Sequence, residues 1–206
     1  MLLIDQKLER RTRMFNIGDN IVYPMHGAGT IDAIEEKEIL GEKLQYYIIK
    51  MPGEVKVMVP TAKAEEMGVR GVIDQSGVTK VLKLLEQDET EMSQNWNKRY
   101  RDNLDKMKTG DVFEVADVVR NLEFKQKERG TLSTGEKKML NNAKTILVSE
   151  LALAENASND EIQQLVDNKI DMSFKEYRVP TESKINLQEN AISKFIPFNN
   201  EGTTNV

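Results

Sequence analysis

The amino-acid sequence predicts an α+β protein, with a small β-barrel at the front and a compact α-helical bundle behind it. Two patterns carry this prediction. Residues 14–61 contain short β-branched and aromatic runs separated by turn residues, a pattern typical of strands. From residue 62 onward, apolar residues recur at helical spacing instead. The chain has 206 residues, which allows one or two domains, and its hydrophobic fraction of 39% can build modest cores.

Four short runs in the front part predict strands: residues 21–23, 30–34, 46–51 and 55–59. In the last run, alternation places the valines on one face and Lys56 and Met58 on the other. In the second run, alternation places Ile31 and Ile34 on opposite faces. Strands this short, joined by tight turns, predict an SH3- or Tudor-like barrel.

Glycines mark the turns of this barrel. Gly41 marks one, and Pro52-Gly53 fits a type II turn. The Gly27-Ala28-Gly29 segment lacks the spacing, the lysine and the following helix of a phosphate-binding loop, so we expect a sharp turn between two strands. His26 is the only histidine and has no cluster of metal ligands near it, which favours a turn residue over a metal site.

The rest of the chain predicts amphipathic helices that pack as one bundle. Their expected ranges are 62–67, 76–87, 93–108, 111–130, 134–156 and 158–170. Four expected caps mark helix starts: Ser93 alone, and the pairs Asp111 with Glu114, Ser133 with Glu136, and Ser158 with Glu161.

These elements divide the chain into four parts. Residues 1–13 form an N-terminal extension, residues 14–67 the barrel, and residues 68–172 the helical domain. Residues 173–206 are rich in Asn, Ser and Thr, and we expect them to form a flexible C-terminal tail. Its four aromatic residues leave docking onto the bundle or a partner open.

Composition excludes several classes of function. With no cysteine and one histidine, the chain offers no thiolate zinc site and no catalytic constellation, so we expect no metal, no cofactor and no enzymatic activity. No apolar run is long enough to span a membrane, and the apolar N-terminal residues precede the basic ones, the reverse of a secretory signal. We therefore expect a cytoplasmic protein, acting as a monomer.

The most informative stretch is residues 93–108. It holds the only tryptophan, Trp96, and carries five basic and two acidic residues, a local charge of +3 on a chain of net charge −5. An aromatic side chain framed by cations and amides suits a surface that grips a nucleic-acid duplex. Because phosphate neutralisation supplies most non-specific affinity, so small a basic patch predicts weak binding that needs a partner for delivery.

A helical wheel places Trp96, Tyr100, Leu104 and Met107 on one stripe of this helix. Leu104 and Met107 are expected in the core. The pattern leaves open whether Trp96 is also core or is exposed, and whether the surrounding charges, including those that flank the stripe, are simply a solvated face.

Several motifs in order give the chain a resemblance to the CarD/CdnL family of bacterial transcription regulators, over roughly residues 14–170. They are Phe15-x-Ile-Gly-Asp19, Val22-Tyr23-Pro24-x-His-Gly27, Val57-x-Val-Pro60, Asn95-Trp96-x-x-Arg-Tyr100, Gly110-Asp111, Val115-Ala116-x-Val-Val-Arg-x-Leu122, Glu128-Arg-Gly130, Leu132-Ser-x-Gly-Glu-Lys-x-Met-Leu140 and Ile146-Leu-Val-x-Glu-Leu-Ala-Leu-Ala-Glu155.

This resemblance implies a Tudor-like domain that binds the β subunit of RNA polymerase, and a helical domain that contacts promoter DNA. The tryptophan would wedge into the minor groove beside the −10 element, at the upstream edge of the bubble, and stabilise the open complex. The implied DNA-binding residues are Trp96, Arg101, Lys98, Arg99, Asn95 and Tyr100.

On the barrel, the resemblance implies polymerase contacts at Lys37, Lys56 and Met58. Met58 is a departure, since the family places a basic residue there, and Lys56 on the same face is the candidate substitute. The alternative function is a non-enzymatic protein–protein adaptor, in which Trp96 is buried and touches no DNA.

Overall fold

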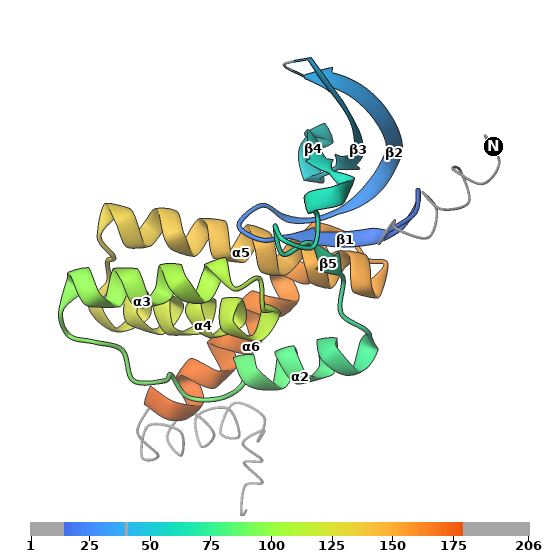
Figure 1. The fold of residues 1–206 in the computed structure, drawn as a ribbon. Coiled ribbons are helices and arrows are strands. Elements are labelled where there is room, and N and C mark those ends of the chain that lie inside the picture. The colour runs from blue at the N-terminus through green and yellow to red at the C-terminus, as the bar shows by residue number, and fades with distance from the viewer. Residues whose placement is uncertain (1–14, 40, 179–206) are drawn as a thin grey trace, which may run out of the picture.

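The computed structural model describes residues 15–39 and 41–178, so the expected N-terminal extension and most of the expected tail lie outside the described residues. A curved antiparallel sheet precedes a bundle of helices, which confirms the predicted α+β fold (Figure 1). The described residues contain no helix that is both long and apolar enough to cross a membrane.

The strands of the barrel form a single antiparallel sheet in the order β4-β3-β2-β1-β5. Their bounds are Asn20–Tyr23 (β1), Gly27–Ile39 (β2), Glu42–Lys50 (β3), Lys56–Pro60 (β4) and Arg70–Gly71 (β5). The barrel core consists of Phe15, Ile21, Ile31, Tyr47, Ile49, Met51, Val59, Ala64 and Val69. The Tyr47 hydroxyl accepts a hydrogen bond from the Phe15 backbone N–H at 3.2 Å, which ties the start of the described chain to this core.

A β-bulge corrects the expected alternation in β2. The register against β3 shifts between Ile31 and Ala33, so that Ile31 and Ile34 both reach the barrel core. Asp32 lies at the shift and meets Lys56 Nζ at 2.7 Å on the outside of the sheet. One extra residue in a strand reverses the facing of everything after it, which simple alternation cannot anticipate.

Two turns fall at glycines where the sequence predicts them, but the turn expected at Gly27-Ala28-Gly29 is wrong. These residues pair with β1 as the start of β2, and the turn lies at residues 24–26. Gly41 and Gly53 both have positive φ, of 82° and 75°. The expected helix over 62–67 is wrong: a 3-10 helix covers Thr61–Lys63 only, and the turn beyond it ends at Gly68. Six residues offer too few backbone hydrogen bonds to sustain an α-helix by themselves.

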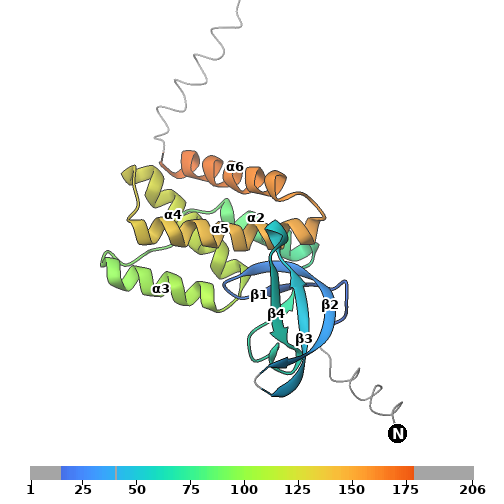
Figure 2. The same cartoon turned by 90° about the horizontal axis from the view of Figure 1, so that it is seen from above.

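In the part of the chain that the structure describes, five α-helices follow: α2 (Gln75–Leu85), α3 (Trp96–Lys108), α4 (Val112–Arg129), α5 (Thr134–Glu155) and α6 (Asn159–Arg178). Helices α4 and α5 occupy the centre, with α3 and α6 on opposite sides of them (Figure 2). The Ser133–Glu136 capping box is confirmed at the start of α5. The expected Ser93 cap is wrong, because Asn95 Oδ1 accepts the Lys98 N–H and α3 begins at Trp96.

Helix α6 runs six residues past the expected start of the tail. Phe174 packs edge-on against Phe124 with ring centroids 5.3 Å apart, and Ser173 Oγ donates to the Gln87 carbonyl at 2.9 Å. The segment between α2 and α3 carries acidic residues that meet this helix: Glu86 pairs with Lys169, and Asp88 and Glu89 pair with Arg178. Residues 173–178 therefore belong to the bundle and hold the α2–α3 connection in place.

The barrel is fastened to the bundle at two points. Gly27 has φ of 95°, and a Cβ there would come within 2.7 Å of Ser149 Oγ, so glycine lets β2 approach α5 closely. The Ala28 N–H then donates to Ser149 Oγ at 2.9 Å. At the second point, Arg70 of β5 forms a bidentate pair with the buried Glu150 carboxylate, at 2.5 and 2.8 Å. These contacts fix the orientation of the two parts.

Candidate nucleic-acid interface

Trp96 is the first residue of α3, at the end of the bundle that lies away from the barrel (Figure 1). Its side chain is 43% exposed. The indole stacks on the Tyr100 ring with centroids 5.4 Å apart, and Tyr100 in turn packs against the bundle core. The alternative in which Trp96 is core is therefore wrong, whereas Met107 is buried and Leu104 is half-buried as expected.

The first residues of α5 contact the indole of Trp96. Trp96 Nε1 donates a hydrogen bond to Ser133 Oγ at 2.9 Å. The same oxygen accepts the Glu136 N–H at 3.2 Å and donates to Glu136 Oε2 at 2.8 Å, so the N-cap of α5 also orients the tryptophan. Gly135 packs against both rings, since a Cβ there would be 3.5 Å from the indole and 3.3 Å from the Tyr100 ring.

Arg99, which the resemblance assigns to the DNA contact, lies inside the protein. It is buried, its Nε donates to Glu136 Oε1 at 2.9 Å, and its Nη1 donates to the Ser93 carbonyl at 2.7 Å. Arg99 is therefore not one of the exposed cations that could contact phosphates on the surface beside Trp96. Its charge is used inside the protein, where it joins the start of α3 to α5.

Glu136 is the centre of this interior network. Its carboxylate is 2% exposed and receives hydrogen bonds from Arg99, Lys125 and Ser133. Burial raises the pKa of Glu136, but the bonds from Lys125, Ser133 and Arg99 outweigh burial and hold the pKa at about 2. The carboxylate is therefore ionised at neutral pH and ties α3, α4 and α5 together beneath Trp96.

The exposed cations near Trp96 are fewer than expected from sequence. Lys98 and Arg101 both point to solvent; Arg101 Nε makes only a long bond of 3.4 Å to the Asn97 carbonyl. Asn95 is exposed as well, with its side-chain oxygen used as the cap of α3. The sequence reasoning missed Lys137 and Lys138, exposed in the first turns of α5 and without an ion pair among the described residues. The capping box places both lysines in the first turns of α5, whereas no local signal sets the start of that helix against Trp96.

On the barrel, Lys37, Lys56 and Met58 share the outer face of the sheet. The register sets Met58 opposite Ile48, Lys56 opposite Lys50 and Lys37 opposite Leu44, and opposed residues point to the same side. Met58 is 51% exposed. Lys37 pairs with Glu35 at 2.5 Å, and the hydrogen bond from Lys56 lowers the pKa of Asp32. The face is thus an apolar strip with ion pairs at its margins.

No group of His, Asp and Glu side chains within residues 15–39 and 41–178 could hold a metal ion. His26 stacks on the Tyr23 ring with centroids 4.4 Å apart, and its backbone N–H donates to the Tyr23 carbonyl at 3.0 Å. This is the turn role that the sequence predicts for it.

Two family models match the chain. Residues 15–73 match the CarD-like/TRCF RID domain, an RNA polymerase-interacting domain, and residues 80–167 match the CarD C-terminal domain. The chain is also 46% identical, over 151 residues, to a Bacillus subtilis (strain 168) protein described as "Putative transcription factor YdeB". That alignment covers 73% of this chain and 98% of the relative.

The chain belongs to the CarD family. It is therefore a transcription factor of a family associated with RNA polymerase. The outer-face residues of the barrel fall inside the first match, and the Trp96–Ser133–Glu136 network falls inside the CarD C-terminal match. The end of α6 lies beyond both matches, so its clamp on the α2–α3 connection is described from this structure alone.

Proposed function

We propose that this CarD-family protein binds the β subunit of RNA polymerase through its barrel and stabilises the promoter open complex through Trp96. The tryptophan would enter the minor groove beside the −10 element, at the upstream edge of the bubble. The observation that carries the proposal is the exposed indole, held in one orientation by Tyr100 and Ser133.

A fixed indole suits a wedge for an energetic reason. Unstacking a base step costs about a few kcal/mol, and the cost is least where the duplex is already opening. A side chain that is ordered before binding loses little conformational freedom when it inserts. A wedge that fits only the melted junction then shifts the equilibrium towards the open state, with no catalytic step.

Lys98 and Arg101 are the proposed phosphate contacts, with Asn95 and Tyr100 beside them. Two or three phosphate contacts give weak affinity for DNA, and the net charge of −5 adds no general attraction. Tethering to polymerase compensates, because it raises the effective concentration of the wedge at the promoter.

The two proposed contacts lie at opposite ends of the molecule. Trp96 begins α3 at the far end of the bundle, whereas the other end of α3 leads to Gly110, whose carbonyl accepts from Arg70 Nε of the barrel at 2.9 Å. A helix of 13 residues spans roughly 20 Å. The Arg70–Glu150 pair and the Gly27–Ser149 contact would keep this separation constant, so that polymerase binding sets where the wedge points.

For the polymerase contact we propose the outer face of the sheet, with Met58 at its centre and Lys37 and Lys56 at its margins. An exposed apolar strip bordered by charges is typical of a protein–protein interface. The test is binding of the full-length protein to purified bacterial polymerase. Met58→Asp should abolish binding and Trp96→Ala should preserve it. Binding of Met58→Asp at wild-type strength would contradict this assignment.

A further inference from the structure

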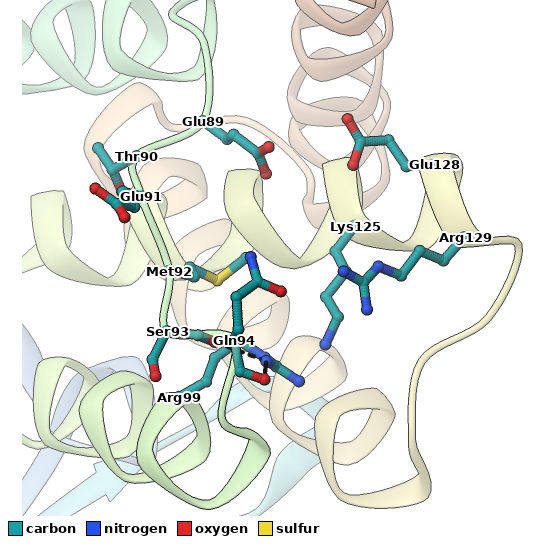
Figure 3. Close-up of a pocket in the computed structure, with 10 residues that line it drawn as sticks. All are labelled: Glu89, Thr90, Glu91, Met92, Ser93, Gln94, Arg99, Lys125, Glu128 and Arg129. Carbon is teal, nitrogen blue, oxygen red and sulfur yellow. Dashed lines mark hydrogen bonds between the residues drawn. The ribbon is translucent and has the colours of Figure 1, made fainter.

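A pocket opens beside the Trp96 helix, between the α2–α3 connection and the second half of α4 (Figure 3). Three cations reach into it: Arg99, Lys125 and Arg129. In Figure 3 the Arg129 guanidinium lies near the Lys125 side chain, with Gln94 across the opening. Neither the proposed wedge nor the proposed polymerase face uses this pocket.

The floor of the pocket carries an unbalanced positive charge. Arg99 and Lys125 are 7% and 8% exposed, and both donate to the same oxygen of Glu136, Oε1. The other oxygen of Glu136 is taken by Ser133. Two buried cations facing one carboxylate leave one excess positive charge, an arrangement that is costly unless an anion completes it.

Hydrogen-bond donors on the floor are also in excess. A lysine ammonium carries three donors, and Lys125 uses one of them on a described residue. Arg99 uses Nε and Nη1, and its Nη2 donates to no residue that the structure describes. Arg129 is exposed and forms no ion pair within the described part of the chain.

Two of the carboxylates at the rim of the pocket form ion pairs with Arg178. Glu89 pairs with Arg178 Nη2 at 2.8 Å, and Glu128 pairs with Arg178 Nε. Glu91 points away from Lys125 and Arg129 (Figure 3). The rim therefore leaves the floor accessible, while Glu89 and Glu128 disfavour a long polyanion that would extend over them.

We propose that this pocket binds a single phosphate group, held by Arg129, Lys125 and Arg99. Two guanidinium groups and an ammonium converging from different directions match the oxygens of a tetrahedral anion. The phosphate has two sources: free inorganic phosphate, or a backbone phosphate of DNA that lies against Trp96. Binding of a DNA backbone phosphate in the pocket rests on the proposed function, whereas binding of free inorganic phosphate does not.

Phosphate in the pocket would affect Trp96 through the hydrogen bonds that link Glu136 to Ser133 and Ser133 to the indole. A phosphate that draws Arg99 and Lys125 away from Glu136 loosens the carboxylate that fixes Ser133, and Ser133 Oγ accepts from the indole. Because Trp96 is the only tryptophan, its emission reports this change directly.

The experiment titrates the full-length protein with sodium phosphate against sodium chloride at equal ionic strength, following Trp96 emission and the backbone amide NMR signals of Gln94 and Arg129. We expect a saturable response to phosphate alone. Arg129→Ala should weaken it about tenfold, whereas Lys83→Ala, an exposed lysine on α2, should titrate as the wild type does. Inorganic triphosphate should bind more weakly than phosphate.

A second experiment, which measures binding to duplex DNA, distinguishes free phosphate from a DNA backbone phosphate as the ligand. If the pocket takes a backbone phosphate, Arg129→Ala also weakens duplex binding and lowers its salt slope by about one unit. If the pocket takes free phosphate only, Arg129→Ala leaves duplex binding unchanged and loses the phosphate response. Either result supports the site. A wild-type protein whose emission and amide signals respond to phosphate no more than to chloride, with duplex binding unaffected by Arg129→Ala, overturns it.

Discussion

Ser133 caps helix α5 and, with the same oxygen, accepts the hydrogen bond of the Trp96 indole at 2.9 Å. Two functions thus meet at one hydroxyl. The cap contributes stability to the bundle, and the indole bond orients the proposed wedge. A hydroxyl has one donor and two acceptor positions, and Ser133 uses all three, on Glu136 and Trp96.

Ser133→Ala should lower the free energy of unfolding and leave the Trp96 side chain less firmly oriented. Loss of an N-cap costs about 1 kcal/mol, measured by urea unfolding. Ser158→Ala is the matched control, because Ser158 and Glu161 form the same pair of reciprocal bonds at the start of α6 without touching Trp96. Both variants should lose similar stability, but only Ser133→Ala should make Trp96 emission more readily quenched by acrylamide. Equal quenching in the two variants would argue against the orienting role.

Glu136 predicts a specific acid dependence of stability. Its pKa in the folded protein is about 2, below its usual 4.5, so ionised Glu136 stabilises the fold above about pH 4.5, and this contribution is lost as the pH falls towards 2. The difference corresponds to on the order of 3 kcal/mol. Unfolding free energies measured between pH 6 and pH 2 should show this decline.

Glu136→Gln should flatten that part of the pH profile. It should also destabilise the protein by about 3–5 kcal/mol at neutral pH, because Arg99 and Lys125 stay buried without their counter-charge. Glu161→Gln serves as control, since Glu161 is paired with Ser158 on the surface. A Glu136→Gln profile that keeps the wild-type decline would assign the acid dependence to other groups.

Substitutions of Arg101 and Arg99 should affect different properties, although the two residues are close in sequence: Arg101 DNA binding, and Arg99 stability. Arg101 is exposed, so Arg101→Ala should change stability by less than about 0.5 kcal/mol, weaken DNA binding across sequences and lower the salt slope by about one unit. Arg99→Lys loses the planar guanidinium that donates to Glu136 and to the Ser93 carbonyl at the same time, and should lower stability instead. An unchanged salt slope for Arg101→Ala would remove it from the phosphate contacts.

Local signals in the sequence predicted much of the fold. The Ser133–Glu136 spacing marked the start of α5, and turns were correctly expected at Gly41 and Gly53, both of which have positive φ. The stripe on α3 correctly placed Met107 in the core. Each of these depends on residues within one or two turns of one another, where spacing alone decides the outcome.

Contacts between distant segments could not be predicted in this way. Arg99 and Arg101 are two residues apart on one helix, and only the position of Glu136, 37 residues from Arg99, decides that Arg99 is the buried one. The same holds for the bond between Trp96 and Ser133. Sequence spacing gives the face of a helix but not the element that covers it.

The end of α6 was missed for a different reason. Ser173 occupies a buried position of the helix, with its hydroxyl satisfied by the Gln87 carbonyl, and the neighbouring Met172 is exposed. A polar residue inside and an apolar residue outside interrupt the stripe that predicts a helix. The bulge at Asp32 misled the strand prediction in a comparable way, since both break a regular period.

The central claim is that Trp96 stabilises the open complex. The most direct measurement is the lifetime of that complex, formed by purified bacterial RNA polymerase on a ribosomal-RNA-type promoter, with and without the protein. Tyr177→Ala, at an exposed aromatic residue of α6, is the matched control. We predict that the wild type and Tyr177→Ala prolong the lifetime and that Trp96→Ala, although it still binds polymerase, does not. A Trp96→Ala protein that prolongs the lifetime as much as the wild type would contradict the account.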